Sequence, residues 1–123
     1  MEKTINISGK EVKLKCTLGT LNRYRMQFNR DPLKDIMSLS KKNEEKASTG
    51  ADFDIESLYM FMNFAWCMAK TGDKNIPDVE DWLDQFEIFD IGVILPEMIE
   101  LLTSNLQQNV DSKKKLTAEE QAM

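Results

Sequence analysis

The 123-residue chain contains no histidine, only two cysteines, three prolines and five glycines. Without histidine it cannot build a Ser-His-Asp or Cys-His nucleophile system, a histidine general base or a histidine-containing metal site. Cys16 and Cys67 cannot form a CxxC pair and are too few for a four-cysteine zinc site, so we expect two free thiols. The glycines are isolated, and neither GxGxxG nor GxxxxGK[ST] occurs, so no nucleotide site is indicated.

Long apolar runs are also lacking. The longest, Leu58–Ala69, is interrupted by Asn63 and falls well short of the roughly 20 residues that span a bilayer. Residues 1–15 lack the apolar core of a signal peptide. We therefore expect a chain that does not contact membranes and works in the cytoplasm, where thiols stay reduced.

Acidic residues outnumber basic ones, giving a net charge of −5, but the two signs are unevenly distributed. Residues 1–42 carry ten Lys/Arg against four Asp/Glu, whereas residues 43–110 carry three Lys against fourteen Asp/Glu. A basic first third is compatible with nucleic-acid binding. No nucleic-acid motif accompanies it, so the simpler interpretation is that the two halves attract each other in the fold. The basic residues that would contact a nucleic acid are Arg23, Arg25, Arg30 and Lys34.

Carboxylates cluster between Asp78 and Asp90, where a calcium loop would need oxygen ligands at fixed spacing and a glycine at its sixth position. That spacing fails from either possible start, Asp73 or Asp78, and no glycine falls in place. The cluster is therefore interpreted as a solvated helix face. We expect no metal, no cofactor and no enzymatic activity.

The first residues predict a β-hairpin. Polar and apolar residues alternate over 4–7 and again over 12–16, on both sides of the turn signal Ser8-Gly9-Lys10. An isolated hairpin is marginal in water, so its apolar face must pack on the helical remainder of the chain. That face consists of Ile5, Ile7, Val12, Leu14 and Cys16.

The rest of the chain predicts helices. Thr17 or Thr20 can cap the first, Asp31-Pro32 begins the second, and 40–52 is expected to be an exposed loop. Asp54 caps the longest, 55–71, which should be the central core helix. A short helix comes after Pro77-Asp78, and a last one covers about 90–107.

The expected inward faces of two helices can also be specified. On the second helix they are Leu33, Ile36, Met37 and Leu39; on the third they are Ile55, Leu58, Tyr59, Met62, Ala65, Trp66 and Ala69, widened by Phe61, Phe64 and Met68. The predicted fold is α+β and mainly α: an N-terminal hairpin packed on four to five helices in one domain over 1–108, followed by a flexible polar tail over 109–123.

The order of these elements carries a resemblance. The hairpin SGKEVKLKCT leads into LGTLNRYRMQFNRDPLKDI, and after a polar stretch come DIESLYMFMNFAWCMAK and PDVEDWLDQF. This pattern, from Thr4 to Leu102, resembles the small tail assembly chaperones encoded by long-tailed phages and prophages of Gram-positive bacteria. One departure is Asn29-Arg30, where that family commonly has a glycine-containing turn before the proline.

The resemblance implies a non-enzymatic protein of the bacterial host cytoplasm. Such chaperones bind the tape measure protein and keep it soluble until the tail tube assembles around it, and they are absent from the mature virion. The tail tube protein is a second candidate partner. The family often has a longer form made by ribosomal frameshifting, and Lys113-Lys114-Lys115 is a candidate slip site that reads equally well as a solubilising basic tail.

A chaperone of this kind should offer an apolar patch with a charged rim. We expect it on the late helices, rimmed by Asp81, Asp84 and Glu87. The aromatic side chains of Trp82, Phe86 and Phe89 could instead be core, or the patch could serve self-association. Two other functions stay open: a structural or connector phage protein, and a small bacterial adaptor or regulator. The expected partner-binding residues are Trp82, Phe86, Phe89, Met98 and Leu102.

Overall fold

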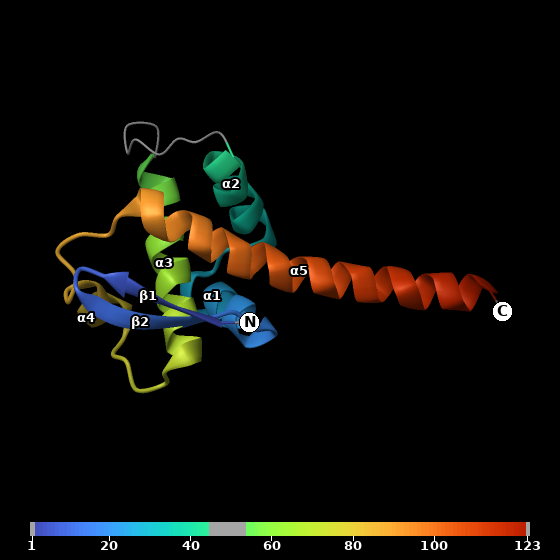
Figure 1. The fold of residues 1–123 in the computed structure, drawn as a ribbon, viewed down its shortest axis with the longest axis horizontal. Helices are drawn as coiled ribbons and strands as arrows, with labels where there is room; N and C mark the ends of the chain where they lie inside the picture. The colour runs from blue at the N-terminus through green and yellow to red at the C-terminus, as the bar shows by residue number, and fades with distance from the viewer. Residues whose placement is uncertain (1, 45–53, 123) are drawn as a thin grey trace.

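The computed structural model describes residues 2–44 and 54–122, with side chains described as far as Leu106. In these residues two strands are followed by five helices, which confirms the predicted α+β, mainly α class (Figure 1). The elements are β1 (Glu2–Ile7), β2 (Lys10–Lys15), α1 (Leu18–Phe28), α2 (Pro32–Glu44), α3 (Ile55–Gly72), α4 (Val79–Leu83) and α5 (Ile91–Ala122). The helix α3 is the centre of the fold, because β2, α1, α2 and α4 all contact it.

The hairpin forms as predicted. β1 and β2 pair antiparallel, and the pair Ile7–Lys10 flanks a two-residue turn in which Ser8 and Gly9 both have positive φ, 52° and 83°. This left-handed geometry matches the twist of the strands and favours glycine at the second position. The turn is secured from outside, because the Ser8 hydroxyl donates a 2.6 Å hydrogen bond to the carbonyl of Ile88. The buried hairpin side chains are Ile7, Val12, Leu14 and Cys16.

The predicted helix starts are also found. The carboxylate of Asp31 accepts the backbone N–H groups of Leu33 and Lys34, and that of Asp54 accepts the N–H of Ser57. Asp78 caps α4 in the same manner. Each bond satisfies an N–H that has no partner inside the helix.

The end of α1 shows how the chain turns at Asn29-Arg30. Asn29 adopts the left-handed conformation, with φ 54°, and its N–H donates to the carbonyl of Arg25. Asparagine is the residue that most often replaces glycine there. The boundary between α1 and α2 therefore forms without a glycine.

Two expected helix ends are wrong. α2 continues to Glu44, so the first residues of the expected 40–52 loop are helical, and the rest of that loop lies outside the described residues. α5 runs to Ala122 instead of ending near Gln107, and Figure 1 shows it extending past the other elements. Both extensions contain good helix formers such as lysine and glutamate, and neither contains glycine or proline after the expected end.

The inward face of α3 is also different in its first turns. Ile55 and Tyr59, expected in the core, are exposed, whereas Phe61, Phe64 and Met68 are completely buried. Elements cover α3 on several sides along its later turns, so no single stripe defines its buried surface. Its C-terminal end lies so close to β2 that a Cβ atom on Gly72 would come within 2.7 Å of the Lys13 carbonyl oxygen.

Candidate functional site

The five expected partner-binding residues differ in how far they are buried. Trp82 is only 3% exposed, and Met98 and Leu102 are completely buried, so the expectation that they form an exposed patch is wrong. The physical reason is that α4 and α5 close the core that the hairpin and α3 leave open. Phe86 and Phe89 are partly buried against the same core. The expected rim residues Asp81, Asp84 and Glu87 are all exposed.

The three aromatic residues of the prediction do lie together. The ring centroids of Trp82 and Phe86 are 4.9 Å apart and those of Phe86 and Phe89 are 5.2 Å apart. Phe89 also makes an edge contact with Phe61 of α3, at 5.8 Å. Edge-on and tilted packing of this kind stabilises aromatic pairs beyond the burial of their surface. The cluster therefore fixes the chain after α4 onto the core.

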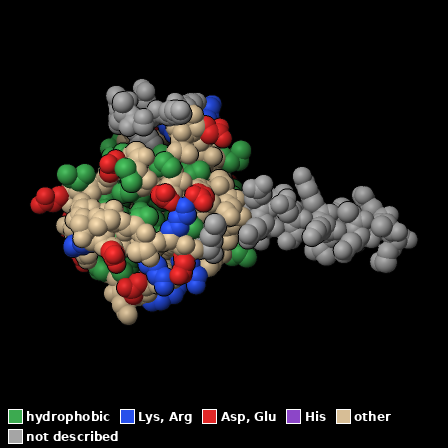
Figure 2. All heavy atoms as spheres, in the orientation of Figure 1, with side chains coloured by type: hydrophobic (Ala, Val, Ile, Leu, Met, Phe, Trp, Pro, Cys, Tyr) green, Lys and Arg blue, Asp and Glu red, His purple; other side chains and the backbone are tan. Residues whose placement is uncertain are grey.

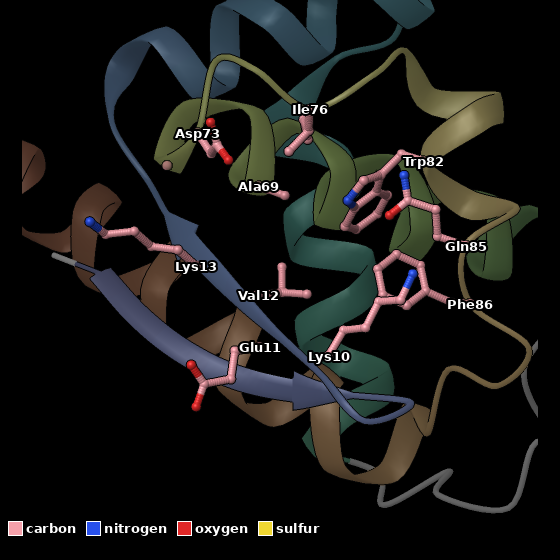
Figure 3. A pocket seen from close by; sticks show the side chains of 11 residues that line it. Lys10, Glu11, Val12, Lys13, Ala69, Asp73, Ile76, Trp82, Gln85 and Phe86 are labelled. Carbon is pink, nitrogen blue, oxygen red and sulfur yellow. The ribbon is translucent and has the colours of Figure 1, made fainter.

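Trp82 and Phe86 of this cluster also line a groove, which lies between β2 and the segment from the end of α3 to just after α4. We name it the β2–α4 groove (Figure 3). Its volume is about 360 Å³. It is lined by Lys10, Glu11, Val12, Lys13, Ala69, Gly72, Asp73, Ile76, Trp82, Gln85 and Phe86.

The β2 wall of this groove is set by strand alternation. Val12 is buried, so it and Lys10 point to the side of β2 that faces the helices, whereas Glu11 and Lys13 point to the other side. The Lys10 ammonium lies 5.7 Å from the centroid of the Phe86 ring, within range of a cation–π interaction. The groove thus has an apolar floor and a cationic end at Lys10.

The two tryptophans differ in their hydrogen bonding. The indole N–H of Trp66 donates to the carbonyl of Pro77 at 3.0 Å. The indole N–H of Trp82 has no acceptor among the described residues, although no fully buried side-chain nitrogen or oxygen of that part of the chain lacks a partner. This N–H must therefore reach the groove, and Figure 3 shows the indole nitrogen directed toward it.

A second groove, which sequence reasoning missed, lies between α2 and α5. We name it the α2–α5 groove; its volume is about 390 Å³. Met37 lines it and is 71% exposed, and Leu33, one turn earlier on α2, is also exposed. Both were expected in the core with Ile36 and Leu39, which are indeed buried. The lining residues are Ile36, Met37, Ser40, Lys41, Glu44, Thr103 and Leu106.

The sequence carried only a weak signal for this second groove. α2 has four apolar residues on 13 positions, which is an ordinary stripe for a helix that packs on a core. That stripe alone could not show which members would be outer, because this depends on where α5 packs.

Reactive groups are scarce in the described part of the chain. Within it, no three His, Cys, Asp or Glu side chains come together in a way that could hold a metal ion. Both cysteines are buried, and burial raises the pKa of Cys16 to about 11 and that of Cys67 to about 12. Such thiols are poor nucleophiles at neutral pH, because the reactive form is the thiolate. Among the described helices, none is long and apolar enough to cross a membrane.

Comparisons with known proteins do not assign the chain to a family. No protein-family model matches it, and neither a curated protein sequence nor a solved structure matches it.

Proposed function

We propose that this protein is a tail assembly chaperone of a long-tailed phage or prophage, which binds the tape measure protein and keeps it soluble in the host cytoplasm during tail assembly. The proposal rests on the resemblance in element order and on the surface of the folded domain. In this proposal the protein is not an enzyme, takes no cofactor and leaves before the virion is mature.

The observation that supports it best is the apolar surface along α2. Leu33 and Met37 are one helical turn apart, are exposed, and lead into the α2–α5 groove, whose floor includes Ile36 and Leu106. An apolar groove between two helices is a typical receptor for the apolar face of a third. Lys41 and Glu44 at its edge supply charges of both signs. A long helical protein that aggregates alone offers such faces.

Other large apolar side chains are exposed as well, and in Figure 2 hydrophobic side chains appear at several separate places on the face that is shown. Apolar side chains that are scattered singly are common on protein surfaces and do not by themselves mark a binding site. These further exposed residues are Leu18, Met26, Ile55, Tyr59, Ile88 and Val93.

The nucleic-acid alternative has less support. Of its candidate contacts, Arg30 is engaged in ion pairs with Asp35 and Glu56, and Arg23 donates to the hydroxyl of Thr71. A guanidinium held in this way has fewer donors left for a phosphate.

The test is co-expression with the tape measure protein of the phage or prophage genome that encodes this chain. Met37→Lys should leave the melting temperature unchanged, because the side chain is exposed, and should abolish solubilisation of the partner. Met26→Lys is the matched control, since Met26 is 75% exposed and does not line the groove. If Met37→Lys solubilises the partner as well as Met26→Lys does, the groove is not the binding site.

A second measurement separates the chaperone from a connector protein. Mass spectrometry of purified virions should detect the tape measure protein and no peptide of this chain. Peptides of this chain in stoichiometric amounts would contradict the proposal.

A further inference from the structure

We infer that the β2–α4 groove binds an extended peptide segment that pairs antiparallel with the outer edge of β2 at Glu11. The segment carries an apolar residue and, two positions later, an acidic residue. This site is separate from the α2–α5 groove and does not depend on the identity of the partner proposed above.

The first support is the free edge of β2. The pair Ile7–Lys10 closes the two-residue turn, so it is hydrogen-bonded, and the next pair, Asn6–Glu11, is not. The N–H and C=O of Glu11 therefore point away from β1, toward the side on which the groove lies. Neither has a backbone partner among the described residues. An incoming strand can satisfy both with one facing residue, as antiparallel pairing does.

The length of this edge is limited on one side. Lys13 is the next residue whose backbone groups point outward, but the close approach of Gly72 covers its carbonyl. Only about one pair of backbone hydrogen bonds is then available. In antiparallel pairing, one residue of the segment can form both hydrogen bonds with the N–H and C=O of Glu11. In parallel pairing, these two groups would bond to two different residues of the segment.

The second support is the indole N–H of Trp82. The side chain is almost wholly buried, its N–H has no acceptor among the described residues, and it faces the groove. A donor at the wall of an apolar groove favours a ligand that brings an acceptor with it. A peptide backbone has a carbonyl at every residue and supplies one here.

The third support is the arrangement of side chains along β2. A residue facing Val12 points to the floor formed with Ala69 and Ile76, and it should be apolar. The residue facing Lys10 points to the same side. Because Lys10 has no ion-pair partner in the described part of the chain, a carboxylate is its natural complement. In an antiparallel segment the residue facing Val12 comes two positions before the one facing Lys10.

The experiment uses the full chain, ¹⁵N-labelled, and the probe acetyl-Thr-Leu-Thr-Glu-Thr-amide. The chain has two tryptophans, so its NMR spectrum contains two indole N–H signals, which Trp82→Phe assigns. We expect the peptide to shift the Trp82 signal and to leave the Trp66 signal in place. A peptide with the leucine and glutamate exchanged is the control and should bind at least several-fold more weakly.

Two variants test the pairing and the charge. Glu11→Pro removes the outward N–H and should weaken binding roughly tenfold, while Thr4→Pro, at an outward position of β1 on the other edge of the hairpin, should bind as the wild type does. Lys10→Glu should lose affinity for the probe and regain it when lysine replaces the glutamate of the peptide.

Three results would overturn the inference: no shift of the Trp82 signal at millimolar peptide, equal affinity of Glu11→Pro and Thr4→Pro, or equal affinity for both peptide orders. A concentration-dependent shift of the Trp82 signal without peptide would also overturn it, because a second copy of this chain would then be the occupant. Each result is independent of whether Met37→Lys solubilises the tape measure protein.

Discussion

The hydroxyl of Tyr24 donates a 2.6 Å hydrogen bond to Oδ2 of Asp35, and both side chains are buried. The same carboxylate accepts two further bonds from the guanidinium of Arg30, which also reaches Glu56 at the start of α3. One buried carboxylate thus joins α1, α2 and the first turn of α3. Burial, and then the bond to Asp35, raise the pKa of Tyr24, so the hydroxyl keeps its proton at any physiological pH.

Tyr24→Phe should lower the free energy of unfolding by about 1–3 kcal/mol, because Asp35 loses a donor in a place that water does not reach. Urea unfolding measures the change. Tyr59→Phe is the control, since Tyr59 is exposed and should unfold at the wild-type midpoint. Equal midpoints for the two variants would show that the Tyr24 hydroxyl does not stabilise the fold.

Gly72→Ala should destabilise the protein by about 1–3 kcal/mol, since the new methyl group would overlap the Lys13 carbonyl and force α3 away from β2. Gly19→Ala is the comparison: its Cβ would meet only a side-chain oxygen of Thr17 at 3.3 Å, and alanine favours the helix. Thermal unfolding of both variants checks this. A wild-type melting temperature for Gly72→Ala would contradict the close approach.

The two thiols should resist alkylation in the native protein and react at the ordinary rate in urea. Burial raises their folded-state pKa values to about 11 and about 12, above the unfolded value of about 8.5. The stabilisation is complete below the unfolded pKa and is lost as pH rises through the folded values. Stability should therefore fall from about pH 8.5 upward, and Cys67→Ala should show a smaller fall than the wild type. Rapid labelling of native protein at pH 8 would refute the burial.

The charge of Asp54 should make stability depend on pH in the opposite direction to the thiols. Its pKa is lowered because the carboxylate accepts hydrogen bonds from the side chain and backbone N–H of Ser57. Its stabilisation of α3 is present above its unfolded pKa of roughly 4 and is lost as pH falls through the lower folded value. Asp54→Asn, which still caps the helix, should lose less stability than the wild type between pH 7 and pH 3. An identical loss in both proteins would show that this cap does not depend on charge.

Local features of the fold were predictable, because they depend on neighbouring residues. The turn at Ser8-Gly9 and the caps at Asp31 and Asp54 each require a specific residue at a specific place, and each is found. The burial of Met98 and the exposure of Met37 depend instead on how α5 lies against α2. Periodicity along one helix identifies apolar positions but not which of them another helix will cover.

The candidate site likewise combines features that the sequence predicts with features that depend on how distant segments pack. The sequence indicated that Trp82, Phe86 and Phe89 belong together, and their rings are in contact. It could not show that Trp82 is buried with its N–H directed into a groove, because β2, which lies far earlier in the chain, supplies the opposite wall. The α2–α5 groove is likewise formed by segments far apart in sequence.

The contacts of the hairpin turn have a consequence for the order of events at the ribosome. Ser8 is held by the backbone of Ile88, and the Lys3 ammonium by the carboxylates of Glu97 and Glu100. A two-stranded hairpin does not persist alone in water. The hairpin therefore becomes fully docked only when the segment from Ile88 to Glu100 has been made, although α3, which packs against β2, comes earlier in the chain. Until that segment has been made, only the earlier helices hold the hairpin.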